Sequence, residues 1–242
     1  LLRGNKLTNW NEIYQSKLTT AEEAIKLIND GDKVVTGFGC GEPFAIERAL
    51  VDNYQNYHDV QIVNMLTLGD SPWCRPEMKG HFTLNCLFAS QSNRKAISLG
   101  VSEFTTSHFY EIPDLIKNYI RPRVTIVMVS PPDEHGYVSF GTTVDYTRGT
   151  ADYCDIKIAQ VNKYMPRTFG NSFMHIRDFT CFIEHDEPLP EVKTVEISDT
   201  EMEIGKYCAS LINDGDCLQL GIGGIPNAVC AQLWDKKDLG LH

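Results

Sequence analysis

A chain of 242 residues, 42% hydrophobic and 22% charged, has a globular composition and enough length to bury a sizeable core. Its net charge of -10 argues against a nucleic-acid-binding surface, because neutralising phosphates requires clustered Lys and Arg side chains. No stretch approaches the roughly 18 apolar residues of a membrane span. We therefore expect a soluble, cytoplasmic protein with neither nucleic-acid nor membrane partners.

The predicted elements alternate between helices and strands along the chain. A helix is predicted over residues 21–28, a strand over 33–36 and a helix over 44–53. Further strands are expected at 60–66, 82–88, 124–130 and 156–162, and further helices at 93–99, 111–119 and 144–153. This alternation is typical of an α/β fold with a mostly parallel sheet covered on both faces.

A proline-rich, acidic stretch at residues 186–193 interrupts the alternation. We predict an N-terminal α/β domain over residues 1–190 and the beginning of a C-terminal domain over residues 191–242. In the second domain the sequence predicts a helix over 201–212, a strand over 217–220 and a helix over 227–235. These elements are too few to close a core of their own.

The second domain repeats the beginning of the first. The hexapeptide LINDGD at residues 27–32 recurs letter for letter at 211–216, an offset of 184 residues. Asn-Asp-Gly-Asp alone is a common turn sequence between the end of a helix and a strand. However, each copy stands between a helix and a strand, and each strand runs into a glycine-rich turn, 37–43 or 221–226, ahead of another helix. The sequence thus indicates a duplicated α/β domain, only begun the second time, within a protein of about 400 residues.

The two glycine turns suggest anion binding. A strand that feeds Gly-x-Gly into a helix with proline in its first turn presents unpaired backbone N–H groups at the positive end of the helix dipole. A phosphate group or the oxyanion of an acyl-transfer intermediate would suit such a turn. A dinucleotide site is disfavoured, because proline stands where the third glycine of its fingerprint is needed and the acidic ribose partner is missing.

Several segments resemble one family. Residues 218–229, LQLGIGGIPNAV, are similar to the coenzyme A-binding segment of the acetyl-CoA hydrolase/transferase family, among the class I CoA transferases. Residues 41–43, 130–136, 139–146 and 165–168 resemble its N-terminal domain, closest to the 4-hydroxybutyrate CoA-transferases. The resemblance implies transfer of CoA between a short-chain acyl-CoA (4-hydroxybutyryl-, butyryl- or acetyl-CoA) and a small carboxylate such as acetate, through a glutamyl-CoA thioester. An acyl-CoA hydrolase and an inactive CoA-binding fragment are the alternatives.

The resemblance also implies site residues. Coenzyme A is expected against the backbone of Gly221, Ile222, Gly223, Gly224 and Ile225. The acyl group is expected near Gly39, Gly41, Glu42, Ser139 and Gly141, across an interdomain cleft. The nucleophilic glutamate is expected two positions beyond His242, so no catalytic residue is assigned within this chain. A homodimer or another homo-oligomer is implied. No metal site is predicted, because the histidines lack ligand spacing and the eight cysteines, expected as free thiols, form no C-x-x-C pair.

Four further residues invite a functional role. We interpret Glu42 as a first-turn carboxylate favoured by the helix dipole, or as a group that supports the site, rather than as the nucleophile. His135 is interpreted as a loop residue and Cys40 as a packing residue. Arg167 suits either a CoA phosphate or the surface, and the sequence leaves the choice open.

Overall fold

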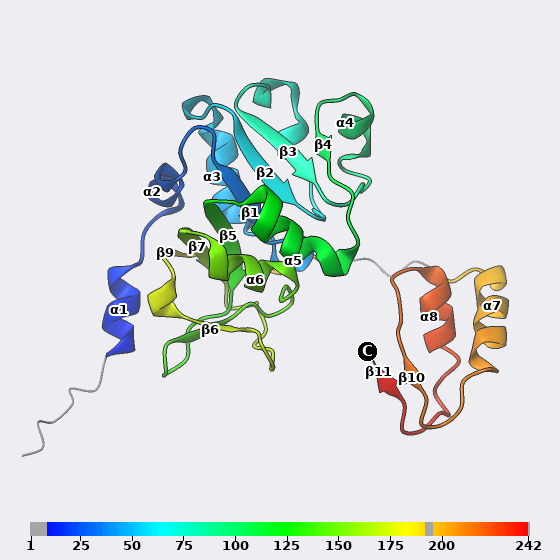
Figure 1. Cartoon of the computed structure of the whole chain (residues 1–242). Helices are drawn as coiled ribbons and strands as arrows, with labels where there is room; N and C mark the ends of the chain where they lie inside the picture. Colours follow the sequence, from blue (N-terminus) through cyan, green and yellow to red (C-terminus); the bar gives the residue numbers. More distant parts are fainter. Residues whose placement is uncertain (1–8, 192–195, 242) are drawn as a thin grey trace, which may run out of the picture. The chain divides into compact units, whose positions relative to one another are not determined.

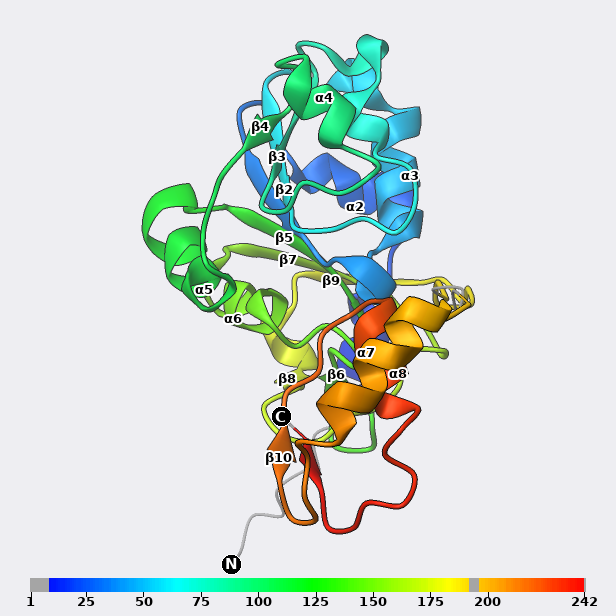
Figure 2. The same ribbon diagram turned by 90° about the vertical axis from the view of Figure 1, so that its right-hand side faces the viewer.

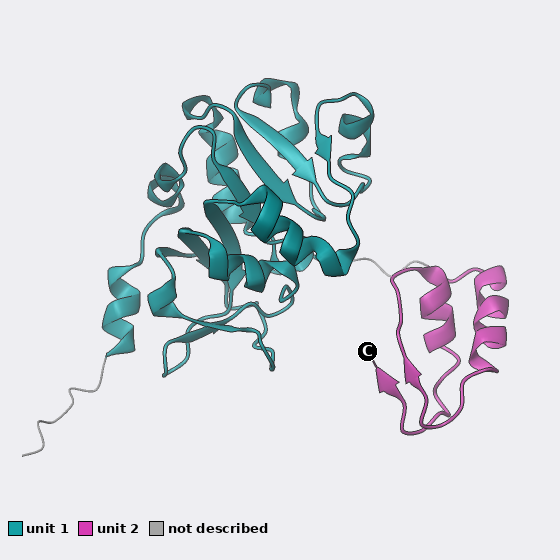
Figure 3. Ribbon diagram, viewed as in Figure 1, with its two compact units in different colours: residues 1–190 teal, residues 191–242 magenta. Residues whose placement is uncertain are grey.

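The computed structural model describes residues 9–191 and 196–241. The chain divides into two compact units, Leu1–Pro190 and Glu191–His242 (Figure 3). Residues 1–8, part of the proline-rich stretch and His242 lie outside the described residues.

The first unit is built on a seven-stranded sheet in the order β4-β3-β2-β1-β5-β7-β9. All its strand pairs are parallel, which confirms the predicted sheet type. The strands are β1 (Lys33–Thr36), β2 (Val60–Asn64), β3 (Phe82–Cys86), β4 (Glu103–Phe104), β5 (Val124–Val129), β7 (Ile156–Val161) and β9 (Cys181–Glu184). The sequence predicted five of these strands; the two edge strands, β4 and β9, were missed because they are short.

Helices cover both faces of this sheet, as predicted (Figures 1 and 2). Helices α2 (Ala21–Ala24) and α3 (Phe44–Asp52) lie on one face, and α5 (Ile112–Leu115) and α6 (Tyr146–Tyr153) lie on the other. Successive residues of β1 therefore enter different cores: Val34 packs with Ile46 of α3, and Val35 packs with Tyr146 of α6. In the described part of the chain, no helix combines the length and the hydropathy needed to cross a lipid bilayer.

Three helical segments differ from their predicted form. Helix α1 (Trp10–Ser16) was not predicted; the Asn9 side chain caps it by accepting the N–H of Glu12. The helix predicted at 111–119 divides into α5 and a π-helical turn, Ile116–Ile120, that ends at Arg121 with φ of +53°. The helix predicted at 21–28 divides into α2 and a 3-10 turn, Ile25–Leu27, whereas α4 (Arg94–Ser98) lies within its predicted range.

A short antiparallel pair, β6 (Tyr137–Ser139) and β8 (Phe173–His175), closes a separate part of the core. Val138 and Met174 of this pair pack with Phe140, Ile176 and Phe182. Each strand has only three residues, too few for a clear alternation in the sequence. The pair positions Ser139, one of the predicted site residues.

The second unit contains α7 (Asp199–Ala209), β10 (Cys217–Leu218), α8 (Gly224–Cys230) and β11 (Gly240–Leu241). Several predicted bounds were wrong. Helix α7 begins two residues and ends three residues before its predicted bounds, β10 is two residues shorter than expected, and α8 begins three residues and ends five residues before its predicted bounds. Gly205 lets α7 approach α8 closely, since a Cβ at this position would lie 2.7 Å from the backbone of Ala228.

The repeated hexapeptide folds into the same turn in both units. The Asn29 N–H donates to Asp32 Oδ2 at 2.7 Å, and the Asn213 N–H donates to Asp216 Oδ2 at 2.7 Å. Asp32 also receives two hydrogen bonds from Arg123, which immediately precedes β5. The conformation of the turn is therefore determined by hydrogen bonds within the hexapeptide. The ion pair between Asp32 and Arg123 stabilises the turn of the first unit further.

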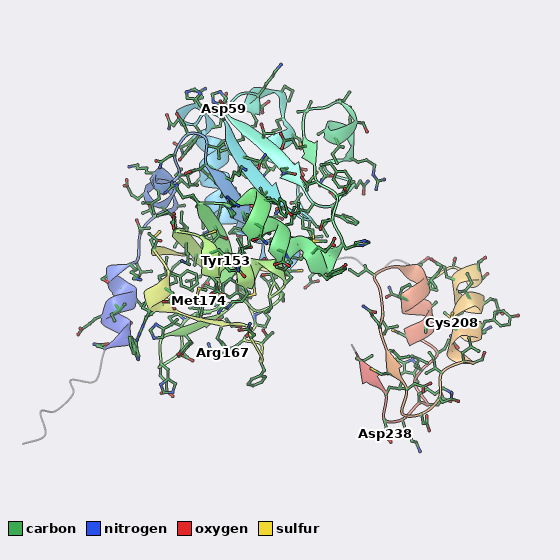
Figure 4. All side chains as sticks on the ribbon, viewed as in Figure 1. Asp59, Tyr153, Arg167, Met174, Cys208 and Asp238 are labelled. Carbon is green, nitrogen blue, oxygen red and sulfur yellow. The ribbon has the colours of Figure 1, made fainter. Side chains whose placement is uncertain are left out.

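The likeness extends beyond the six identical letters. The glycine of each hexapeptide donates its N–H to a distant carbonyl, that of His58 at 2.9 Å in the first unit and that of Lys237 at 3.0 Å in the second. The next residues, Asp59 and Asp238, have left-handed φ values of +53° and +55° (both labelled in Figure 4). Each leads to a strand that pairs in parallel with the strand after the hexapeptide, so β11 corresponds to β2.

Candidate functional site

The strand order places a topological switch point at the carboxyl ends of β1 and β5. From β1 the sheet grows through β2, β3 and β4 on one side, and through β5, β7 and β9 on the other. Ligands of open α/β sheets bind outside the strand ends at such a point. The first glycine turn, 37–43, begins directly after β1 and therefore lies at this position.

Several backbone N–H groups of this first turn are bonded within the unit. Gly37 donates to Ile126 O at 2.9 Å, Gly39 donates to Leu66 O at 2.8 Å and Gly41 donates to Phe38 O at 3.0 Å. The Ala45 N–H, in the first turn of α3, donates to the Gln160 side chain at 2.9 Å. These bonds reduce the number of N–H groups that the turn offers to an anion, and anion binding by this turn stays a prediction.

The predicted acyl-site residues of the first unit lie together and are buried. Gly39, Gly41 and Glu42 belong to the turn after β1, and Ser139 and Gly141 belong to the segment that follows β6. The two segments touch, because a Cβ at Gly41 would overlap the side chain of Thr143. Their burial means that they shape the switch point from below its surface.

The segment after β6 is held by the Ser139 hydroxyl. It accepts the N–H of Gly141 at 3.1 Å and that of Thr168 at 3.3 Å, and it donates to the Ser172 hydroxyl at 3.3 Å. Gly141 has φ of +57°, and a Cβ there would overlap Met165. Ser139 and Gly141 thus fix a tight loop next to the glycine turn.

Two buried carboxyl groups lie beneath the turn. Glu42 is 2% exposed and accepts the Thr67 hydroxyl at 2.8 Å, and Glu47 of α3 is 5% exposed. Burial raises the pKa of Glu42 to about 8, and burial, with repulsion from Glu42 adding to it, raises the pKa of Glu47 well above its usual value. Among the described residues, Glu47 Oε1 has no hydrogen-bond partner. The helix-dipole interpretation of Glu42 is therefore wrong, because burial outweighs the dipole and favours the protonated acid.

The surface of the switch point is formed by Phe38 and Thr142, which the sequence analysis did not single out, and by Cys40, which it interpreted as a packing residue. Phe38 is partly exposed and stacks on Tyr146, with ring centroids 5.3 Å apart. Cys40 is also partly exposed and donates its thiol to Pro190 O at 3.3 Å, while Thr142 is exposed. Phe38 and Cys40 are the non-glycine positions of GFGCG. A side chain with a glycine on each side was the sequence pattern that could have indicated a residue at the surface of the site.

Among the described residues the second unit has no counterpart of β5 or β7, so the hydrogen bonds that these strands make to the first glycine turn and its helix are absent from the second. Ile222 is 98% exposed, and Gly223, with φ of +142°, is the N-cap of α8. Within the described residues, the N–H groups of positions 222–225 make no hydrogen bond. Gly224 lies against the Glu201 side chain of α7, so a Cβ there would overlap that carboxylate. The turn thus combines free donors with two positions that require glycine.

The remaining candidates have partners or are exposed. Arg167 donates to Asp133 at 2.5 Å and to Tyr137 O at 3.0 Å, so its guanidinium is engaged within the first unit. His135 is exposed, with Nε2 3.6 Å from Glu134. All eight cysteines are free. Residues 9–191 and 196–241 contain no group of three or more His, Cys, Asp or Glu side chains placed to hold a metal ion.

Comparison with known proteins identifies the family. Residues 4–193 match the acetyl-CoA hydrolase/transferase N-terminal domain. The chain is 44% identical over 234 residues to the 4-hydroxybutyrate coenzyme A transferase of Clostridium kluyveri, covering 96% of this chain and 54% of that protein. It is 32% identical over 248 residues to the butyryl-CoA:acetate CoA-transferase of Anaerostipes caccae, covering 97% of this chain and 54% of that protein.

The fold agrees with this assignment. The crystal structure of RipA from Yersinia pestis superposes with a TM-score of 0.92 at 31% identity, covering 97% of this chain and 57% of that one. The chain thus spans about half the length of the relatives that it matches. With the parallel sheet and the matched domain, these likenesses show that the chain belongs to the acetyl-CoA hydrolase/transferase family.

Proposed function

We propose that this chain is part of a CoA-transferase that moves CoA between a short-chain acyl-CoA and a small carboxylate such as acetate. The observation that carries the proposal is the 44% identity, over nearly the whole chain, to a protein named as a 4-hydroxybutyrate coenzyme A transferase. The relative named for butyryl-CoA and acetate supports the same class of acyl group and acceptor.

The chemistry implied by the family proceeds by covalent exchange. A glutamate carboxylate attacks the acyl-CoA thioester and forms an acyl-glutamyl anhydride, and CoA leaves as the thiolate. The thiolate then attacks the glutamyl carbonyl, which releases the acyl group as a carboxylate and leaves a glutamyl-CoA thioester. The acceptor acid regenerates the glutamate by the reverse steps. By the resemblance, this glutamate lies two positions beyond His242, outside the given sequence.

The open turn at Gly221–Ile225 is the part of this chain that we assign to coenzyme A. Its unpaired N–H groups at the start of α8 suit an oxygen of the cofactor or of the thioester. The turn of the first unit has a different role in the proposal. Three of its N–H groups are bonded internally, and Gly39, Gly41, Glu42, Ser139 and Gly141 support the surface formed by Phe38, Cys40 and Thr142. Assembly into a homo-oligomer is part of the proposal and follows from the family alone.

The activity is tested with the protein encoded by the complete open reading frame. Butyryl-CoA and acetate should give acetyl-CoA and butyrate, and the intact mass of the protein should rise by one CoA moiety after incubation with butyryl-CoA alone. Sustained release of free thiol without an acceptor acid would instead identify an acyl-CoA hydrolase. If the protein catalyses no exchange and releases no thiol, the enzymatic proposal is rejected.

The role of the second turn is tested by Gly223→Ala. Its φ of +142° strains any side chain, so the KM for acyl-CoA should rise at least about tenfold, which corresponds to about 1.4 kcal/mol of binding. Gly215→Ala is the matched control, because it strains the hexapeptide turn of the same unit at φ of +85°. An equal loss in both variants would mean that the second unit is merely destabilised.

A further inference from the structure

The largest cavity of the first unit lies away from the switch point. It has a volume of about 840 Å³ and is bordered by α1, the β6–β8 pair, the second half of α6 and the start of β7. Met174, which lines it, is labelled in Figure 4. Lys157 stands near the amino end of β7, whereas the glycine turn follows the carboxyl end of β1, so parallel strands separate the two places. A volume of this size is within the range of small-molecule sites, about 300–1,000 Å³.

Two buried polar atoms that line this cavity have no hydrogen-bond partner among the described residues. They are His175 Nε2 and Arg148 Nη1, two of the three such side-chain atoms found there. His175 is 7% exposed, and its Nδ1 accepts the Arg177 N–H at 3.1 Å, which places the ring hydrogen of the neutral imidazole on Nε2. Arg148 Nη1 lies 2.7 Å from Asp152 and forms an ion pair with it, so it is not left without a partner. His175 Nε2 is the buried donor of this cavity without an acceptor, and such a donor is costly and usually marks a missing partner.

The charges around the cavity favour an anion. Arg148, Lys157 and Arg177 line it, against the carboxylates of Asp152 and Asp178. Asp152 forms its ion pair with Arg148. Asp178 interacts electrostatically with Lys17, outside the cavity, and with His175, inside it. Lys157 and Arg177 have no carboxylate partner among the described ion pairs; Lys157 Nζ donates to Cys154 O at 2.6 Å, and Arg177 Nε donates to His175 Nδ1 at 3.2 Å.

Aromatic rings border the same space. The ring of Trp10 meets His175 edge-on with centroids 4.5 Å apart, and Tyr137 does the same at 4.9 Å. The Arg177 guanidinium lies over Trp10 at 5.0 Å. His175 Nε2 is covered, so a ligand oxygen reaches it only when the packed rings shift. Binding should therefore change the environment of the Trp10 indole.

We propose that this cavity binds a phosphate-bearing small molecule of nucleotide size, with Lys157, Arg177 and Arg148 around the phosphates and the His175 N–H as an additional donor. Phosphate is favoured over a single carboxylate because the donors come from α6, β7 and the segment after β8, and a phosphate accepts hydrogen bonds on three oxygens. The site is distinct from the turn at Gly221–Ile225, which belongs to the second unit.

The test is a titration of the 242-residue chain with ADP, followed by tryptophan fluorescence and calorimetry. Saturable binding is expected, and pyrophosphate should compete, whereas adenosine and succinate should not. Lys157→Gln and Arg177→Gln should each weaken binding about tenfold, the loss of roughly one charge-assisted contact. Lys33→Gln is the matched control, because Lys33 is exposed at the start of β1 and does not line the cavity. Thermal melts establish that each variant is folded.

Two variants separate the cavity from other sources of the signal. Trp10→Phe should abolish the fluorescence change while calorimetric binding persists, and Gly223→Ala, in the second unit, should leave ADP affinity unchanged. CoA is titrated as well, because it carries the same adenosine diphosphate moiety; competition between CoA and ADP that Lys157→Gln weakens supports the cavity. The proposal is overturned if ADP does not saturate, if succinate binds equally well, or if Gly223→Ala abolishes binding while Lys157→Gln has no effect.

Discussion

Replacing one of the two buried carboxyl groups should change how stability depends on pH. Glu42→Gln keeps an oxygen that accepts the Thr67 hydroxyl but removes the titrating group. In the folded chain burial raises the pKa of Glu42 to about 8, so the folded state binds a proton that the unfolded chain releases near the usual value of 4.5. Stability from this carboxyl is therefore full below pH 4.5 and is lost as pH rises toward 8.

The magnitude follows from linkage. One extra proton on the folded state changes the free energy of unfolding by about 1.4 kcal/mol per pH unit. Between pH 5.5 and 7.5 we expect the free energy of unfolding to fall more steeply with pH in the parent chain than in Glu42→Gln, by up to about 1.4 kcal/mol per pH unit, while Glu47, whose pKa shifts in the same direction, contributes to the slope of both. Removing Glu42 also removes its repulsion of Glu47, which can only lower the remaining slope.

Urea unfolding at several pH values measures these slopes. Trp73 is a suitable probe, because it is 4% exposed and borders the same small cavity of about 10 Å³ as Glu42. Glu134→Gln is the control, since the Glu134 side chain is 86% exposed. Equal slopes in the parent and in Glu42→Gln, with equal urea m-values, would refute the protonated state of Glu42.

Four further substitutions test the packing and the turns. Gly41→Ala should destabilise the first unit by about 1–3 kcal/mol, because a methyl group there overlaps a buried threonine, and thermal unfolding measures the loss. Gly205→Ala should destabilise the helix pair of the second unit by a similar free energy, measured as a loss of helical circular dichroism. Gly149→Ala, with open space around it in α6, should instead raise the free energy of unfolding by up to about 1 kcal/mol. Equal effects of the two substitutions would contradict the packing argument. Asp32→Asn should cost about 2 kcal/mol of stability at pH 7 and much less at pH 3. Burial raises the pKa of Asp32, but its bonds to Arg123 and to a backbone N–H outweigh burial and lower the pKa, so the stability that the carboxylate contributes is lost as pH falls. A difference in stability that does not depend on pH would argue against the ion pair.

Much of the fold could be predicted because its signals are local. The apolar runs of the central strands give their positions, and alternation with helices gives the parallel sheet. The hexapeptide determines its own turn, since its hydrogen bonds join residues three apart: Asn29 to Asp32, and Asn213 to Asp216. The strands that were missed, among them β4, β6 and β9, have two to four residues and lie outside the repeated pattern of helix, turn and strand that indicated the four-residue β1.

The sequence by itself determined the family, the α/β order, the duplicated turn and the two glycine-rich segments where chemistry was expected. Tertiary structure decided how the first of those segments is bonded. Gln160, 115 residues from Ala45 along the chain, satisfies the first helix end, and burial among several elements favours the protonated form of Glu42. Both effects depend on groups that only folding brings together, so the local sequence around Gly37–Pro43 could not predict them.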